Sequence, residues 1–148
     1  SGFQTVNQYD GSYNRYWHIP TNLVSVTITD ETALGYGAFQ NCTMLKDIHI
    51  NAGVTNLGSY AFANSGITNL TTVLPAAVKS IGSYAFQNCA GLRELPVTDG
   101  VTSIGSYAFS GCTNARTMTF PNTVTNIGQY AFQNCAGLTA VEVPTITT

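Results

Sequence analysis

The chain has 148 residues, of which only 8% are charged: five Lys or Arg against seven Asp or Glu, for a formal net charge of −2. An ordinary soluble domain carries roughly 25% charged residues. The slightly acidic balance leaves no basic surface for nucleic acid, and no apolar run reaches the roughly 20 residues of a membrane-spanning helix. We therefore expect neither nucleic-acid binding nor membrane insertion, in a chain whose length suits one domain.

Residues 1–22 are rich in aromatic side chains and share no pattern with the rest of the chain. Five of the 16 aromatic residues stand here: Phe3, Tyr9, Tyr13, Tyr16 and Trp17. The segment begins with Ser-Gly rather than Met, which is typical of a fragment excised from a longer protein.

From residue 23 onward the chain repeats itself about every 23 residues. The pair Ala-Phe recurs at Phe39, Phe62, Phe86, Phe109 and Phe132. An aliphatic residue followed by Gly stands five positions before each Phe, as in Ile81-Gly82. A unit this short cannot enclose a core by itself, so each copy must stack on the next and form a solenoid.

Each copy is expected to contribute one short strand to a parallel sheet along one wall. Alternating apolar residues such as Ile48 and Ile50 predict strands with one face turned inward. The expected strands are 23–28, 45–50, 67–74, 92–97, 115–120 and 138–143. One residue is missing before the third of these strands, which predicts a local bulge. Gly, Pro and Asn supply the corners, and Tyr-Ala-Phe-x-Asn-Cys allows one tight helical turn at most.

The segment Ile-Gly-Ser-Tyr-Ala-Phe-Gln-Asn-Cys-Ala-Gly-Leu at 81–92, nearly repeated at 127–138, resembles the BspA-type leucine-rich repeat. The resemblance covers about residues 23–144. It implies a leucine-rich-repeat right-handed solenoid, mostly β, with short parallel strands on the concave face and tight helical turns and loops on the other sides. It also implies part of a long surface or secreted protein of gut or oral bacteria, or of some protists, with a role in adhesion.

We accordingly divide the chain into two parts. Residues 1–22 are expected to be a cap or linker whose aromatic side chains cover the open end of the core, because a solenoid end needs such a cover. An exposed aromatic patch that binds sugar or protein is the alternative. Residues 23–148 are expected to form about five 23-residue repeats, as a fragment of a longer protein.

Cysteine and asparagine recur at fixed phases of the repeat. Cys42, Cys89, Cys112 and Cys135 share one phase, with Ser65 in the second copy. Parallel side chains from stacked coils suit neither tetrahedral zinc nor disulfide geometry, so we expect buried free thiols and no metal. The preceding residue is Asn in every copy but the fourth, which has Gly111, and this Asn is expected to hydrogen-bond the backbone of a corner.

The outward positions of the expected strands carry half of the charged residues: Lys46, Asp47, Arg93, Glu94, Arg116 and Glu142. Together with His49 and Asn69 they form the candidate partner-binding surface. A solvated face without a partner is the simpler interpretation. However, a chain so poor in charge that concentrates it on one sheet face favours a recognition surface, where mixed charges give specificity.

A second candidate surface is aromatic and comprises Tyr60, Tyr84, Tyr107 and Tyr130, together with Trp17. The first interpretation of the Tyr column is packing at the edge of the coil, with the hydroxyl groups in water. Regularly spaced aromatic faces could also stack on sugar rings. A carbohydrate-binding module is therefore an alternative function, and a spacer that projects other domains is another.

Catalysis is not expected. The two histidines, His18 and His49, stand in no metal or nucleophile motif, and Asp47 and Glu94 are two coils apart, about 10 Å by strand spacing. That separation slightly exceeds the range of an inverting glycosidase pair. We therefore expect a non-enzymatic binding or adhesion module without cofactors, extracellular or at the cell surface. We expect it to be a monomer with a protein or glycan partner on a host or microbial surface.

Overall fold

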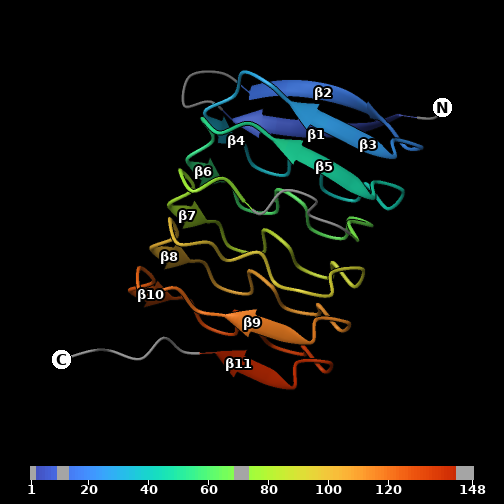
Figure 1. Cartoon of the computed structure of the whole chain (residues 1–148). Helices are drawn as coiled ribbons and strands as arrows, with labels where there is room; N and C mark the ends of the chain where they lie inside the picture. Colours follow the sequence, from blue (N-terminus) through green and yellow to red (C-terminus); the bar gives the residue numbers. More distant parts are fainter. Residues whose placement is uncertain (1–2, 10–13, 69–73, 143–148) are drawn as a thin grey trace.

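The computed structural model describes residues 3–9, 14–68 and 74–142, and it describes side chains from residue 19 onward within those ranges. The chain winds into a stack of coils (Figure 1). Each coil contributes one two-residue strand to a five-stranded parallel sheet: β4 (Ala33–Leu34), β6 (Asn56–Leu57), β7 (Ser80–Ile81), β8 (Ser103–Ile104) and β10 (Asn126–Ile127). The expected solenoid with short parallel strands is confirmed.

This five-stranded sheet was not expected, because sequence analysis assigned the Gly that follows each strand to a corner. The register pairs the aliphatic residues of successive coils, as in Leu57 with Ile81 and Ile81 with Ile104. Gly must follow because the coils approach closely: a Cβ on Gly82 would lie 2.6 Å from the backbone carbonyl carbon of Gly58. Two-residue strands are too short to show an alternating pattern.

A second set of strands forms the wall that was expected, within shorter bounds. β3 (Ser25–Ile28) pairs in parallel with β5 (Asp47–Ile50), and β9 (Thr117–Thr119) pairs with β11 (Ala140–Glu142). The expected strand at 92–97 is reduced to one bridge, Glu94 with Thr117. Pro96 explains this, because proline has no N–H to donate to a ladder. Most of the expected strand at 67–74 lies outside the described residues.

The third side of each coil contains the Tyr-Ala-Phe-x-Asn-Cys segment, for which at most one helical turn was expected. It consists of turns, and the described residues contain no helix. Backbone N–H groups here alternate between two kinds of partner. Phe62 donates to Ala85 of the next coil, whereas Ala63 donates to Tyr60 of its own coil. The alternation requires left-handed backbone at two positions per coil, as at Tyr84 (φ 61°) and Asn88 (φ 56°). Where side chains depart from the repeat, Gly37 and Gly111 hold these positions, also with positive φ.

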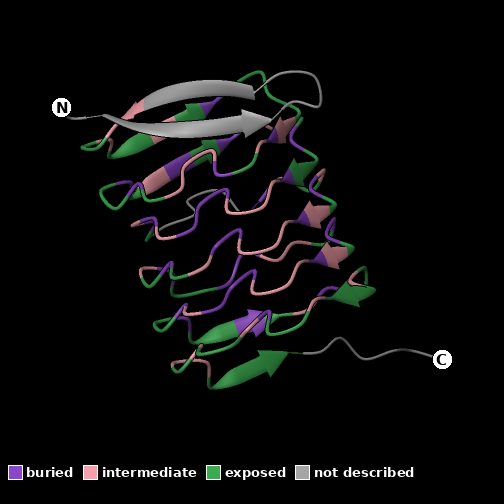
Figure 2. Ribbon diagram, turned by 180° about the vertical axis from the view of Figure 1, so that it is seen from behind, coloured by how far each residue is buried: buried purple, intermediate pink, exposed green. Residues whose placement is uncertain are grey.

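The core runs along the axis of the stack and is built from columns of equivalent residues. The rings of Phe39, Phe62, Phe86, Phe109 and Phe132 stack on one another with centroids 5.2 to 5.7 Å apart. Figure 2 shows the buried segments of the inner coils and the exposed last strands. In the last coil, Ile127 is 47% exposed, whereas the equivalent Ile104 is 1% exposed.

The amino-terminal segment forms an antiparallel hairpin of β1 (Phe3–Tyr9) and β2 (Asn14–Pro20), which sequence analysis did not predict. The hairpin lies at the end of the stack where the first coil begins (Figure 1). Ile19 at the end of β2 packs against the hydrophobic core. The division into a cap at 1–22 and a solenoid at 23–148 stays a prediction.

Candidate partner-binding surface

We call the outward side of residues 24–28, 46–50, 68, 93–94, 116–119 and 139–142 the strand wall. Its first column contains Lys46, Thr68, Arg93, Arg116 and Thr139. Backbone hydrogen bonds hold neighbours of the column in register: Thr68 donates to Lys46, and Arg116 donates to Arg93 at 2.9 Å. Three of the five Lys and Arg residues of the chain therefore stand on one column.

The acidic residues and His49 stand on the two columns beside it. Asp47 pairs in register with Ser25, and Glu94 with Thr117. Glu142 accepts a hydrogen bond from Thr119 Oγ1 at 3.4 Å. Of the residues singled out by sequence analysis, Asp47 is half-buried and Asn69 lies outside the described residues. The others on this wall are exposed: Lys46, His49, Arg93, Glu94, Arg116 and Glu142.

The structure brings two of these residues together, Arg93 and Arg116, at a pocket that sequence analysis missed. The pocket has a volume of about 460 Å³ and is lined by Thr68, Gly91, Arg93, Asn114 and Arg116. Gly91 lines it with backbone, because a Cβ there would lie 2.5 Å from the Ile67 carbonyl oxygen of the preceding coil. The sequence carries one signal for this pocket, the residue that is missing before the third expected strand. Thr68 of that coil lines the pocket.

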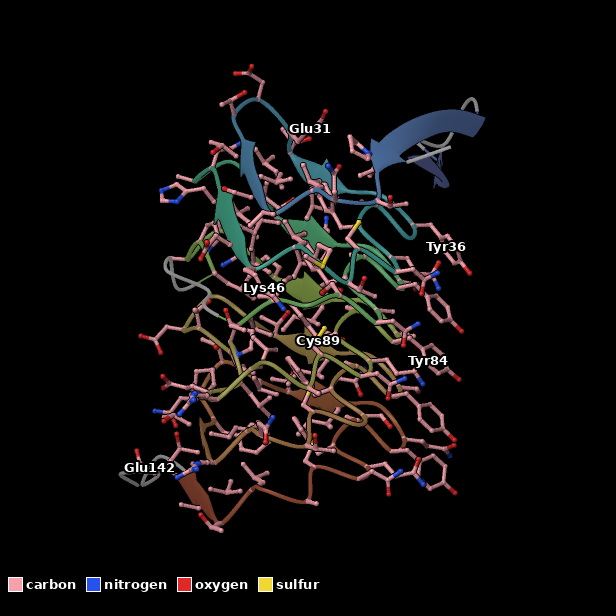
Figure 3. The ribbon with its side chains drawn as sticks, turned by 90° about the vertical axis from the view of Figure 1, so that its right-hand side faces the viewer. Glu31, Tyr36, Lys46, Tyr84, Cys89 and Glu142 are labelled. Atoms are coloured by element: carbon pink, nitrogen blue, oxygen red, sulfur yellow. The ribbon has the colours of Figure 1, made fainter. Side chains whose placement is uncertain are left out.

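The Tyr column lies on the opposite side of the stack. Figure 3 shows Tyr36 and Tyr84 on one side and Glu142 on the other, with Cys89 between them. The rings from Tyr60 to Tyr130 stack with centroids 4.6 to 5.1 Å apart, and Tyr36 covers Tyr60 at 5.3 Å. Partial desolvation and the neighbouring phenols raise the pKa of Tyr60. Both faces of each inner ring are thus occupied by other rings. The side chain of Trp17 lies outside the described residues.

Asparagine side chains form a second ladder beside the Tyr column. Asn64 Nδ2 donates to Asn41 Oδ1 at 2.8 Å, and Asn88 Nδ2 donates to Asn64 Oδ1 at 2.9 Å. The expectation that these amides bond corner backbone was wrong for these three residues. At Gly111 the space that a Cβ would need is taken by the Asn88 amide oxygen.

All four cysteines are free thiols, as predicted. The predicted burial is confirmed for Cys42, Cys89 and Cys112, whereas Cys135 is only half-buried. Cys89 Sγ donates to the Phe62 carbonyl of the preceding coil at 3.1 Å, and Cys112 and Cys135 repeat this bond one coil further each. Burial raises the pKa of Cys89 to about 11, against the weaker opposing effect of hydrogen bonds with Ser65. Burial also raises the pKa of Cys112 and Cys135.

The described residues contain neither a metal-binding cluster nor a membrane-spanning helix. No cluster of three or more His, Cys, Asp or Glu side chains there is arranged to hold a metal ion. No helix in that part of the chain is long and apolar enough to cross a membrane.

The repeat geometry agrees with a family model. The BspA type leucine rich repeat region matches residues 13–139 in six copies. The chain belongs to the BspA-type leucine-rich-repeat family. For this BspA-type chain, a search of curated protein sequences found no match.

Three solved structures resemble this BspA-type solenoid. A leucine rich cell surface protein from Faecalibacterium prausnitzii superimposes with a TM-score of 0.80 at 20% identity, over 99% of this chain and 40% of that one. A leucine-rich repeat protein from Bacteroides ovatus gives 0.74 at 28% identity, over 97% and 40%. The T. pallidum leucine rich repeat protein gives 0.74 at 23% identity, over 95% and 68%. The chain therefore spans about two fifths of the first two proteins.

Proposed function

We propose that this chain is a non-enzymatic binding module of a bacterial surface or secreted protein, and that its strand wall binds a protein partner. The observation that carries the proposal is the column of Lys46, Arg93 and Arg116 with acidic residues beside it. The other sides of the coil repeat largely the same residues, whereas on the strand wall the outward side chains differ from coil to coil. Mixed exposed charge of this kind selects a partner by electrostatic complementarity.

Two further observations support a protein partner. The similar protein from F. prausnitzii is described as a cell surface protein, which favours a location where partners come from other cells. The inner Tyr rings cover each other on both faces, so a sugar ring could stack on the end rings but not between inner ones. The carbohydrate alternative is therefore less favoured than protein binding.

The test compares capture of surface proteins from host epithelial cells and from neighbouring bacteria. The wall pair, Arg93→Gln with Glu94→Gln, removes one charge of each sign from the strand wall. The control pair, Lys79→Gln with Asp99→Asn, removes one charge of each sign from exposed residues elsewhere on the surface. We expect the control pair to capture the same identified partner as the unaltered chain, and the wall pair to capture at least about tenfold less. Equal capture by the wall pair would overturn the proposal.

A glycan array separates the alternatives. A signal that disappears with Tyr130→Ala, which removes the exposed end ring of the column, but survives the wall pair would favour carbohydrate binding instead. If neither protein capture nor the glycan array gives a signal, the remaining interpretation is a spacer that projects other domains.

A further inference from the structure

The pocket at Arg93 and Arg116 has the features of a site for an anion. The two guanidinium groups come from adjacent coils whose backbones are joined by the hydrogen bond from Arg116 N to Arg93 O, 2.9 Å long. Both line the same space of about 460 Å³. Strands in such a ladder are roughly 5 Å apart, so a single planar group can contact both guanidinium groups at once.

Neither arginine is neutralised by a residue that the structure describes. Among residues 19–68 and 74–142, no carboxylate lies within ion-pair distance of either guanidinium. Like charges placed side by side on neighbouring strands destabilise a sheet, and an outward position accepts many other polar residues. The pair is therefore unfavourable in the free protein and becomes favourable when an anion lies between the two groups.

The remaining lining residues fit this interpretation. Asn114 Nδ2 donates to the Ala90 carbonyl at 2.6 Å, which fixes the amide at the edge of the pocket. The hydroxyl of Thr68 has no partner among the described residues, and a threonine hydroxyl can donate to an oxyanion. Gly91 contributes no side chain, so the floor of the pocket is backbone.

The surrounding charge selects the kind of anion. Glu94 follows Arg93 and is exposed, and the whole chain has a formal net charge of −2. Within the pocket, a dianionic phosphate group would be repelled by this background more than a singly charged carboxylate would. Arginine also binds planar carboxylates through two parallel hydrogen bonds.

We propose that the pocket between Arg93 and Arg116 binds a carboxylate presented by an acidic peptide segment. This inference rests on the proposed function, in which the strand wall binds a protein, and it identifies the chemistry of the partner at that point. A carboxylated sugar offers the same group, and the experiment separates the two sources.

The experiment measures fluorescence anisotropy of a labelled, end-capped peptide with four Glu residues at low ionic strength. The matched peptide carries four Gln residues. We expect binding of the Glu peptide, and at least about tenfold weaker binding with Arg93→Gln or Arg116→Gln, because a hydrogen bond to a charged group contributes that much. Arg116→Lys keeps the positive charge but loses the two parallel hydrogen bonds of the guanidinium, and it should weaken binding less than Arg116→Gln. Lys79→Gln, with the same loss of charge elsewhere, should bind like the unaltered chain.

Several outcomes would overturn the inference. Equal loss with Lys79→Gln would show attraction by overall charge, and stronger competition by inorganic phosphate than by acetate would show a phosphate site. Binding of sialyllactose without binding of the Glu peptide would assign the pocket to carboxylated sugars. Circular dichroism of each variant checks that the fold is retained.

The two proposals fail separately. If the Arg93→Gln and Glu94→Gln pair loses its protein partner while Arg93→Gln and Arg116→Gln still bind the Glu peptide normally, the pocket inference fails and the proposed function stands. If pocket-dependent peptide binding is found but the strand wall captures no partner, the proposed function fails.

Discussion

The two long sides of the solenoid follow opposite rules. On the Tyr side the same residues recur in most coils, and these side chains contact their own kind: Phe on Phe, Tyr on Tyr, Asn on Asn. On the strand wall the backbone pairs as regularly, yet the outward residues change from Lys46 to Thr68 to Arg93. In a stacked repeat, interfaces between neighbours provide the stability. Residues that recur therefore maintain the stack, and residues that vary are available for recognition.

The largest contrast is expected between a recurring ring and a variable charge in the same coil. Phe86 is fully buried between two other rings, so Phe86→Ala should lower the free energy of unfolding by about 3–5 kcal/mol. Arg93→Ala, on the exposed wall, should change it by less than about 0.5 kcal/mol. Urea unfolding followed by circular dichroism measures both. Similar losses for the two variants would contradict the division between the sides.

Alkaline pH should weaken the recurring side through its thiols. An unfolded thiol ionises with a pKa near 8.5, whereas burial raises the pKa of Cys89 to about 11. The folded state keeps this proton and the unfolded state loses it, so the contribution is complete below about pH 8.5 and is lost as pH rises toward 11. The free energy of unfolding should fall by up to about 3 kcal/mol over this interval.

Cys89→Ser is the matched variant, because Ser65 already stands at this phase of the repeat. Urea unfolding with reductant between about pH 7 and pH 10 should show a shallower decline for Cys89→Ser than for the unaltered chain. Identical declines would mean that tyrosine and lysine, and not the buried thiol, cause the pH dependence.

The Asn ladder tests a smaller contribution. Asn88 has φ 56° and donates to Asn64 Oδ1, so Asn88→Ala loses the side-chain bond and places alanine in a left-handed conformation. The expected loss of unfolding free energy is about 1–2 kcal/mol. Asn88→Gly also loses the side-chain hydrogen bond, but glycine adopts the left-handed conformation readily. Its loss of unfolding free energy should therefore be smaller than that of Asn88→Ala. If both variants lose equally, backbone conformation is not the cause.

Sequence analysis predicted the coil and its columns, because a period near 23 residues with fixed Phe and Cys phases admits few other folds. It missed the sheet of two-residue strands, since such short strands have no pattern of their own. It also missed the left-handed backbone, although a signal was present: Gly37 and Gly111 each stand where other copies have Tyr or Asn.

The site was predicted unevenly for a similar reason. Single residues such as Arg93 and Arg116 follow from the strand pattern, because outward positions can be counted from the sequence. The pocket combines side chains from three coils, one of which is a residue short, so its lining depends on how Thr68, Gly91 and Asn114 align across that gap. Contacts across coils of unequal length cannot be counted from a period.

The smallest effect bears most directly on the strand wall. If Arg93 and Arg116 repel each other in the free protein, Arg116→Gln should raise the free energy of unfolding by a few tenths of a kcal/mol at low salt. The gain should disappear near 1 M salt, where the screening length falls to about 3 Å. Lys79→Gln is the control, because Lys79 stands between Thr55 and Thr102 in its own column and should show no gain. Urea unfolding at the two salt concentrations measures both. A loss of stability with Arg116→Gln at low salt would mean that the guanidinium makes favourable contacts in the free protein, and the arginine pair would then maintain the stack like the residues that recur.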